Sequence, residues 1–392
     1  MSALTRRLRG LGGRRALAPL ATVLAGLLVA AAFIALSGRD PVATLHAVFV
    51  GSGLDWLLPW TGDRATAATN LQQTLLLVTP LLLLGMAVAL PFRAGLLNIG
   101  GQGSYVLGSS AAVWVGSSLG GLPGWAHVVL AMAAGALAGG LLTGLAGVLK
   151  TSFGAHEVIT TIMLNYVAVW IGAYLFGLGG PLQDPSQPGV PSSRTIASAA
   201  RLPVFWGDPQ LQGAHVGLFV ALAIVLITGV VLARAAVGYE IRAVGASAEA
   251  ARYGGIGVGR TLVKVMLVSG LFAGLAGALD VLGWEFHLDA SDITASQIGY
   301  LGIAVALLGR NSAGGVIAAS VLFGALVSGT SQRNLDPSVF PPSLAGGLAI
   351  VVQGIIVLVV AVDLLSLRLP RRLRHLRPAR RAARTAEAGA ER

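Results

Sequence analysis

Apolar runs of roughly 20 residues recur along almost the whole chain, and they restrict its fold more than any other feature. An α-helix of that length, rising about 1.5 Å per residue, crosses a hydrocarbon core about 30 Å thick. Hydrophobic residues make up 55% of the 392 residues and charged residues only 11%, which leaves no stretch long enough for a soluble catalytic domain. The sequence therefore predicts an all-α fold, a polytopic membrane helical bundle.

Ten of these runs are assigned as transmembrane helices, so the transmembrane domain is expected to extend over 17–367. The eighth and ninth runs are short and nearly adjacent, so 296–330 forms either two full spans or a re-entrant hairpin. The first run is long for the apolar part of a signal peptide, and we expect it to remain as a span. The predicted spans are approximately 17–36, 71–91, 96–118, 125–148, 157–178, 214–233, 261–283, 296–309, 314–330 and 343–367.

Lysine and arginine are distributed unevenly about these spans. All but five of the 27 lie on one side, the exceptions being Arg39, Arg64, Arg194, Arg201 and Arg333. The positive-inside rule therefore places a basic N-terminal tail (1–16), a central loop (234–260) and a basic C-terminal tail (368–392) in the cytoplasm, with external loops at 37–70 and 179–213. The same rule explains the net charge of +11, so we predict a multi-pass protein of the cell membrane with no nucleic-acid partner.

The central cytoplasmic loop is the most highly charged part of the predicted membrane domain. A short helix is expected inside it, with Ser247 as its N-cap, Glu249 in its first turn and Gly254 just past its end. A capped helix held between two spans is suited to docking a protein on the cytoplasmic side. An ordinary solvated loop with arginines at the membrane surface is the alternative.

Glycine is abundant, with 54 residues, and several glycines lie four residues apart inside predicted spans. This spacing places both members of a pair on one helix face and lets a second backbone approach closely. Such packing supports a helical bundle but says little about what the bundle does. The pairs are Gly135 and Gly139, Gly140 and Gly144, and Gly270 and Gly274.

Motifs for catalysis or cofactor binding are not supported by their context. Neither Lys150 nor Lys264 follows the glycine that a P-loop requires, so this chain is not expected to bind ATP. A G-x-S-x-G match at 116–120 has no strand before it, and His156 has no second histidine four residues later. Cysteine is absent. We therefore predict that the chain is not an enzyme and has no catalytic residue, metal site or cofactor.

Three sequence blocks together resemble the permease subunits of bacterial ABC importers in the ribose, branched-chain amino acid and nucleoside group. They are LLNIGGQGSYVLGSSAA (96–112), HEVITTIMLNYVAVWI (156–171) and YEIRAVGASAEAARYGGI (239–256), and the second is most similar to the nucleoside and simple-sugar branch. The resemblance covers most of 71–365. It implies a translocation path for a nucleoside or simple sugar, with ATP used by a separate ATP-binding subunit. A second permease subunit of different sequence and an extracytoplasmic substrate-binding lipoprotein are the other implied partners.

The resemblance also implies that 239–257 is the coupling helix, which fits into a groove of the ATP-binding subunit. The residues agree with that role, because small side chains allow close contact and charged ones can fix the register. The predicted contact residues are Glu240, Arg242, Ala243, Gly245, Glu249, Ala250, Ala251 and Gly255.

Polar residues at membrane depth are candidates for lining the translocation path, since an unpaired polar group in hydrocarbon is costly. Uncharged amides suit a neutral polar cargo that must pass without tight binding. Hydrogen bonding between helices is an equally valid interpretation of any single residue. The candidates are Asn98, Gln102, Asn165, Gln297 and Gln353.

An ion-gradient-driven secondary transporter or channel for a small polar solute is the alternative function. Such a carrier is expected to place acidic residues near the bilayer midplane. Most carboxylates of this chain lie in predicted loops, and Asp280, shortly before Trp284 and Glu285, is the main exception. The distribution of carboxylates therefore favours the ATP-driven importer.

Overall fold

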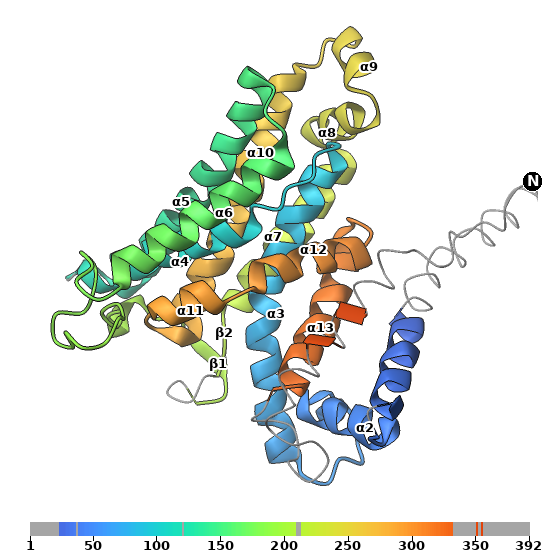
Figure 1. The fold of residues 1–392 in the computed structure, drawn as a ribbon, viewed down its shortest axis with the longest axis vertical. Coiled ribbons are helices and arrows are strands. Elements are labelled where there is room, and N and C mark those ends of the chain that lie inside the picture. The colour runs from blue at the N-terminus through green and yellow to red at the C-terminus, as the bar shows by residue number, and fades with distance from the viewer. Residues whose placement is uncertain are drawn as a thin grey trace, which may run out of the picture.

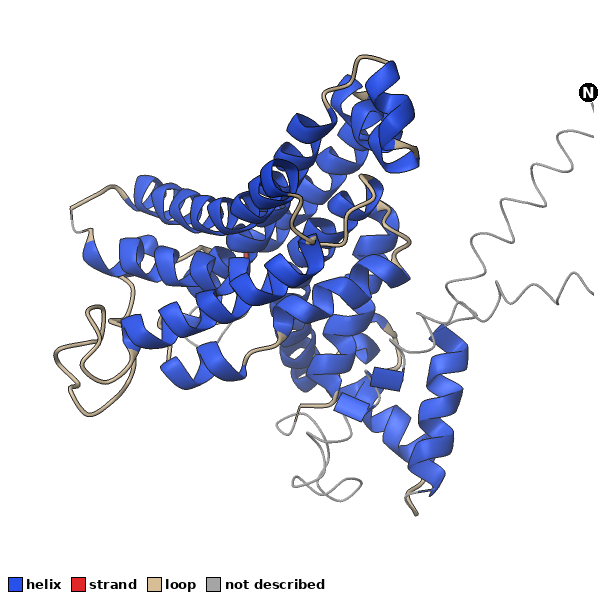
Figure 2. Cartoon of the chain, turned by 45° about the horizontal axis from the view of Figure 1, so that its top comes forward, coloured by secondary structure: helices blue, strands red, loops and turns tan. Residues whose placement is uncertain are grey.

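The computed structural model describes residues 23–36, 38–119, 121–208, 213–331, 350–351 and 354–355. Helices dominate the described chain and cross one another obliquely (Figures 1 and 2). The tails predicted at 1–16 and 368–392, and nearly all of the span predicted at 343–367, lie outside the described residues.

Six helices in the described part of the chain are long and apolar enough to cross a membrane, which confirms the prediction of a helical membrane protein. The predicted runs at 96–118 and 314–330 are also helical, as α4 (Gly101–Ser118) and α13 (Ala313–Gly329). However, α4 is rich in glycine and serine, and α13 has only 17 residues. The six are α3 (Arg64–Arg93), α5 (Gly124–Phe153), α6 (Glu157–Phe176), α7 (Gly217–Arg234), α10 (Val258–Asp280) continued by the π-helix η3 (Val281–Glu285), and the interrupted pair α11 (Ala290–Ala295) and α12 (Ile298–Leu308).

Helix α3 forms the centre of the molecule. Every residue from Leu81 to Pro91 is buried, because α10, α12 and α13 pack around this half of the helix. A helix that is apolar on all sides is stable only where it is enclosed by other helices. With 30 residues, α3 is about 45 Å long at 1.5 Å per residue, so it connects the two ends of the molecule.

Helices α4, α5 and α10 pack together through glycines. A β-carbon on Gly139 of α5 would lie 2.6 Å from the Cα atom of Gly274 of α10, which leaves no room for a side chain. A β-carbon on Gly270 would likewise overlap the carbonyl oxygen of Gly139. A β-carbon on Gly135 would lie 2.7 Å from the carbonyl oxygen of Gly108 in α4. The glycine pairs predicted from their spacing of four residues therefore do mediate close helix packing.

Residues 296–330 form a helical hairpin with arms of unequal length. The 11 residues of α12 span only about 16 Å at 1.5 Å per residue, about half of a hydrocarbon core. The turn between α12 and α13 places Arg310 and Asn311 at positive φ angles of 50° and 53°. Such angles let the chain reverse within four residues, and α12 reaches a membrane-spanning length only together with α11 before it.

The predicted external loop 37–70 is partly helical, which corrects its assignment as a loop. Asp40 caps α2 (Pro41–Gly51) by accepting a 2.8 Å hydrogen bond from the Val42 N–H, and a 3₁₀ turn, η1 (Leu54–Leu57), follows. Asp63 caps α3 in the same way through the Thr66 N–H, so α3 begins seven residues before the run predicted at 71–91. Each capping residue starts its helix within the polar connection, so the helix begins before the apolar run does.

The predicted external loop 179–213 contains little regular structure. It includes a 3₁₀ turn, η2 (Ser198–Ala200), and a strand, β1 (Val204–Trp206), that pairs antiparallel with β2 (Ala214–His215). The ring of His215 is buried against Gly283, and its Nδ1 atom accepts a 3.2 Å hydrogen bond from the Gly217 N–H. Burial without a partner for Nε2 lowers the pKa of His215 to about 4.

The opposite end of the molecule carries two short helices, α8 (Ala236–Ala246) and α9 (Ala248–Tyr253), at the top of Figure 1. We call it the α9 end. It also holds the last turns of α3 and α7 and the first turn of α10. The loop predicted at 234–260 is therefore mostly helical, because α8 directly follows α7 and α10 begins at Val258.

Candidate functional site

The buried connection between α3 and α4 is held by the first of the predicted amides. Residues 95–100 are not helical, although they lie inside the helical bundle. The Nδ2 group of Asn98 donates to Ser269 Oγ at 2.7 Å, and its Oδ1 atom accepts from the Gly100 N–H at 2.8 Å. Both ends of this side chain are therefore occupied by protein partners. Non-helical backbone is tolerated within a membrane domain when its polar groups are paired in this way.

Two further predicted amides complete this network. Asn165 of α6 accepts from the Gly103 N–H at 2.8 Å and donates to the Ile99 carbonyl at 2.9 Å. Gln102 donates to the Ser296 carbonyl and accepts from the Gly299 N–H, both at 2.8 Å, across the break between α11 and α12. The structure thus brings Asn98, Gln102 and Asn165 into one buried region.

The amide network has a clear structural role, while its role in translocation stays a prediction. Asn98, Gln102 and Asn165 are buried, and both amide atoms of each bond to protein. Gln297, by contrast, is exposed at the first turn of α12, and Gln353 lies outside the described residues. In this conformation the three buried amides join α4, α6, α10 and the α11–α12 break.

Asp280, the unusual buried charge, orients a tryptophan. Its two carboxylate oxygens accept hydrogen bonds from the Tyr105 hydroxyl and from the Trp284 indole N–H. Trp284 lies in η3, where α10 widens to a π-helix, a distortion often found at functional sites. The carboxylate therefore fixes the position of an aromatic ring at the end of a long transmembrane helix.

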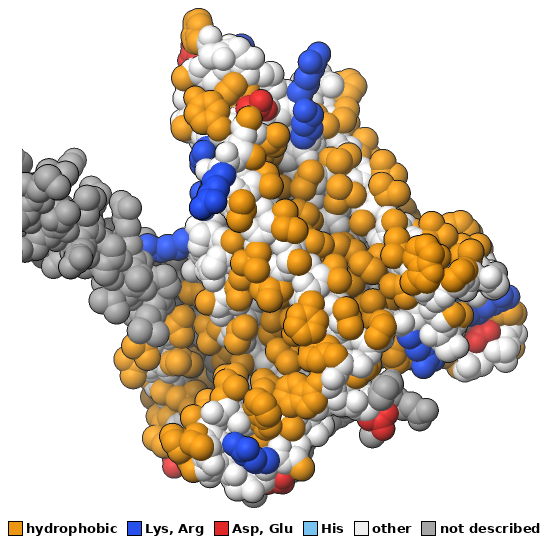
Figure 3. All heavy atoms as spheres, turned by 180° about the vertical axis from the view of Figure 1, so that it is seen from behind, with side chains coloured by type: hydrophobic (Ala, Val, Ile, Leu, Met, Phe, Trp, Pro, Cys, Tyr) orange, Lys and Arg blue, Asp and Glu red, His pale blue; other side chains and the backbone are white. Residues whose placement is uncertain are grey.

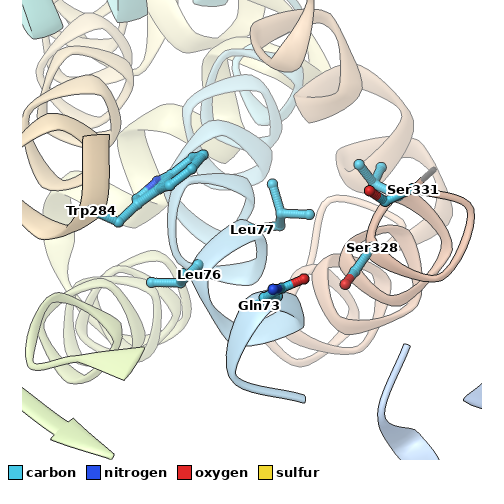
Figure 4. A pocket seen from close by; sticks show the side chains of 7 residues that line it. Gln73, Leu76, Leu77, Trp284, Ser328 and Ser331 are labelled. Atoms are coloured by element: carbon cyan, nitrogen blue, oxygen red, sulfur yellow. The ribbon is translucent and has the colours of Figure 1, made fainter. Parts of the chain in front are cut away.

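The Trp284 ring forms one wall of a cavity of about 300 Å³. Figure 4 shows the ring on one side, Ser328 and Ser331 on the other, and Gln73 with its leucine neighbours on α3 between them. Gln73, Ser328 and Ser331 were not predicted as site residues. Gln73 could have been recognised as a glutamine inside an apolar run. The two serines reach the cavity only because the chain at and after the end of α13 packs against α3.

The chemistry of this cavity suits a neutral solute with a planar face. Trp284 presents an aromatic surface, and the lining opposite it contains three polar residues, Gln73, Ser328 and Ser331, that already interact within the protein. Ligand sites are commonly apolar cavities with a few polar groups that fix orientation. Among the described residues, no group of three or more His, Asp or Glu side chains could hold a metal ion. We call this cavity the Trp284 cavity.

The predicted capped helix is present at the α9 end. Ser247 accepts a 3.2 Å hydrogen bond from the Ala250 N–H as the N-cap of α9, and Gly254 follows the helix as its C-cap. Glu249 lies in the first turn and is exposed together with Ala250. The local prediction is therefore confirmed, including both caps.

Several predicted contact residues hold α8 and α9 to the membrane domain. Ala251 is only 4% exposed, packed in one cluster with Val244 and Val258. A β-carbon on Gly245 would overlap the carbonyl oxygen of Arg93 at the end of α3. Four members of the predicted set are exposed, namely Gly245, Glu249, Ala250 and Gly255, whereas Glu240, Arg242 and Ala243 are half-buried.

A short ion pair joins two other helices at this end. Lys150 Nζ of α5 lies 2.6 Å from Glu157 Oε2 in the first turn of α6. Glu157 lies at the positive N-terminal end of α6, so the helix and Lys150 both stabilise its carboxylate. The pair fixes the tight connection between α5 and α6, which also contains Gly154 at a φ angle of 70°.

The sequence is similar to known transport proteins. It matches the family described as branched-chain amino acid transport system / permease component over residues 70–361. It is 36% identical to the guanosine ABC transporter permease protein NupP of Bacillus subtilis (strain 168), over 82% of this chain and 88% of that protein. Identity to the glucose ABC transporter permease protein TsgB13 of Haloferax volcanii is 34%, over 80% of each chain. Identity to the nucleoside ABC transporter permease protein NupB of Lactococcus lactis subsp. cremoris is 27%, over 91% of this chain and 94% of that protein.

Proposed function

We propose that the cargo of this chain, which belongs to the branched-chain amino acid transport system / permease component family, is a nucleoside. It is a multi-pass permease subunit of the plasma membrane and part of an ABC importer for nucleosides or sugars. Relatives named for guanosine or nucleosides and one named for glucose leave both cargo classes open. The choice between them rests on the Trp284 cavity.

The aromatic wall of the Trp284 cavity carries the choice of a nucleoside. Stacking of a nucleobase on an aromatic side chain is worth about 1–3 kcal/mol, and every base has a π-face to offer. Gln73, Ser328 and Ser331 line the other side of the cavity. A simple sugar has no π-face and would contact the indole, which Asp280 holds in place, only through its C–H groups.

The proposed arrangement in the membrane places the α9 end in the cytoplasm. Of the described lysines and arginines, Arg93, Lys150, Arg234 and Arg260 lie at that end, as the positive-inside rule requires. Ten spans and two cytoplasmic termini complete this proposal. The side that carries α2 and β1 would then face the substrate-binding lipoprotein, and a second permease of different sequence would complete the translocation path.

The proposed partner at the α9 end is an ATP-binding subunit, which binds and hydrolyses the ATP. Its groove would receive the outer surface formed by Glu249, Ala250 and Gly255. Gly245 contacts the end of α3, and Ala251 packs against Val258 at the start of α10. A movement of α9 is therefore passed directly to these two helices.

The same two helices reach the Trp284 cavity. Gln73 lies on α3, and Trp284 lies on η3, which continues α10 without a break. Helices transmit displacement as stiff rods when their packing has two discrete arrangements. This direct connection supports the proposal that docking of the ATP-binding subunit controls the cargo cavity.

Cargo choice can be tested by uptake into proteoliposomes that contain the complete complex with ATP on the α9 side. We expect uptake of labelled guanosine, competition by other nucleosides and little competition by glucose or leucine. Trp284→Ala should raise the KM for guanosine about 5- to 140-fold, the equivalent of losing about 1–3 kcal/mol of stacking. Trp284→Phe, which keeps a ring but not the indole N–H, should retain most of the affinity.

A matched control is Trp125→Ala, because Trp125 is 75% exposed near the start of α5, away from the cavity. Its KM should equal that of the wild type. Preferential uptake of glucose, or a Trp284→Ala variant with an unchanged KM for guanosine, would contradict the proposed cargo.

A further inference from the structure

A cleft of about 710 Å³ lies at the α9 end, between α7, α8 and the turn that joins α12 to α13. Three arginines from different helices converge on it: Arg93 at the end of α3, Arg234 at the end of α7 and Arg242 on α8. Asn311, from the turn between α12 and α13, also lines it. None of the described residues that line the cleft is acidic. We call it the arginine cleft.

Polar atoms in the arginine cleft lack partners. The Nη1 atom of Arg242 is buried and has no hydrogen-bond partner in the described structure, and the same holds for the Oδ1 atom of Asn311. Arg93 is already engaged, since its Nε atom donates to the Asn311 carbonyl at 2.8 Å and fixes the turn. A buried guanidinium N–H without an acceptor is costly, so the cleft is suited to an anion.

The wall of the arginine cleft is apolar. Leu226, Gly229, Val230 and Ala233 of α7 line it at spacings of three and four residues, which places them on one helix face. From Arg234 this face runs about 12 Å toward the other end of the molecule, at 1.5 Å per residue. Figure 3 shows lysine and arginine side chains toward the α9 end above a broad hydrophobic surface. The cleft therefore joins positive charge at a helix end to an apolar groove beside the helix.

We propose that the arginine cleft binds an anionic phospholipid. Its phosphate lies between Arg234 and Arg242, and an acyl chain lies along the apolar face of α7. Asn311 Oδ1 is then placed to accept a hydrogen bond from a headgroup hydroxyl such as that of phosphatidylglycerol. Basic pockets between transmembrane helices are suited to acidic headgroups because charge and hydrocarbon contact are met together.

A lipid fits this cleft better than an acidic side chain of a partner protein. A carboxylate would satisfy the arginines but would leave the groove along Leu226 and Val230 without an occupant. Val230 is exposed, so an acyl chain lying against it would cover apolar surface of the protein. The arginine cleft shares no lining residue with the Trp284 cavity.

The site also bears on the proposed coupling helix. Arg242 lies on α8 three residues before Gly245, which contacts the end of α3. A phosphate held between Arg234 of α7 and Arg242 of α8 would therefore tie the coupling end to the membrane. The proposal predicts that an anionic lipid stiffens α8 against α7.

The test is binding of phosphatidylglycerol to the purified, delipidated complex, measured by native mass spectrometry and by the shift in melting temperature. Phosphatidylcholine and inorganic phosphate serve as the comparison ligands. We expect phosphatidylglycerol to bind and to raise the melting temperature, with neither comparison ligand doing so. Each arginine near a membrane surface contributes about a fivefold change in affinity, so R234Q should bind about fivefold and R234Q/R242Q about 25-fold more weakly.

R260Q is the matched control, since Arg260 is exposed at the same end of the molecule but does not line the cleft. It should bind phosphatidylglycerol as the wild type does. Equal binding by wild type and R234Q/R242Q would overturn the proposal. Displacement of the lipid by inorganic phosphate would show a site for free anions instead. Loss of the ATP-binding subunit from R234Q/R242Q, with lipid binding unchanged, would assign the cleft to that partner.

Discussion

The neighbouring residues Ala250 and Ala251 provide a sharp test of how the α9 end works. Ala250 is exposed, whereas Ala251 is 4% exposed and packs against Val244 and Val258. A tryptophan at Ala250 therefore adds bulk only to the outer surface of α9. A tryptophan at Ala251 must instead displace the contact between α9 and the start of α10.

The two substitutions should differ in their effect on stability. Overpacking of a buried site costs about 1–3 kcal/mol, and more where the added side chain is large, so Ala251→Trp should loosen α9 from the membrane domain. Ala250→Trp should change the stability of the free permease by less than about 0.5 kcal/mol. Glu249→Arg places a positive charge at the positive end of α9, which costs on the order of 1 kcal/mol at most for such a short helix.

The assay combines hydrogen exchange of 236–257 with capture of the ATP-binding subunit by the purified permease. Ala250→Trp should leave exchange unchanged and abolish capture, while Ala251→Trp should speed exchange as well as weaken capture. Trp125→Ala, an exposed position near the start of α5 and away from α8 and α9, serves as a control that should behave as the wild type does. Normal capture and normal uptake by Ala250→Trp would refute the proposed docking surface.

Three further predictions concern the packing and polar groups of the membrane domain. Gly274→Ala should prevent folding, because a β-carbon would overlap the carbonyl oxygen of Gly135, whereas Gly314→Ala meets no atom within 4 Å and should raise or preserve the melting temperature. The pKa of His215 is lowered to about 4 from its usual 6.5. As the pH falls from 6.5 to 4, the free energy of unfolding should therefore decrease by about 3 kcal/mol, because only the unfolded chain takes up the proton in that range. His215→Asn, which can still accept from the Gly217 N–H, should lose this pH dependence of the melting temperature. Asn165→Leu leaves the Gly103 N–H unpaired, so it should lower the yield of folded protein and the uptake of cargo by about the same factor. A full yield of folded protein with lost uptake would instead place Asn165 in the translocation path.

Features set by neighbouring residues could be predicted from the sequence. The caps of α9 were predicted because Ser247 and Gly254 act within one or two turns of the helix. The glycine spacing of α5 and α10 indicated close packing because the period of a helix alone places such residues on one face. The apolar runs likewise indicated most helices, although α2 was missed because its 11 residues are shorter than any span.

Features that depend on distant contacts could not be predicted. Gln102 and Ser296 are separated by 194 residues, so nothing local indicated that one amide bridges the α11–α12 break. The inward orientation of Ala251 and the contact between Gly245 and Arg93 also arise only when α8 and α9 fold against α3 and α10. Asp280 was recognised as unusual, but its bond to Tyr105 required the packing of α4 on α10, whereas Trp284 lies only four residues further along the same helix.

The most direct test of the central claim is the energy source of transport. The measurement is uptake of labelled guanosine by proteoliposomes that hold the permease with or without its ATP-binding subunit, second permease and substrate-binding protein. The account predicts concentrative uptake only when all subunits and ATP are present, and none under a proton or sodium gradient alone. Accumulation of guanosine by the permease under an ion gradient, with no ATP-binding subunit in the vesicles, would contradict it.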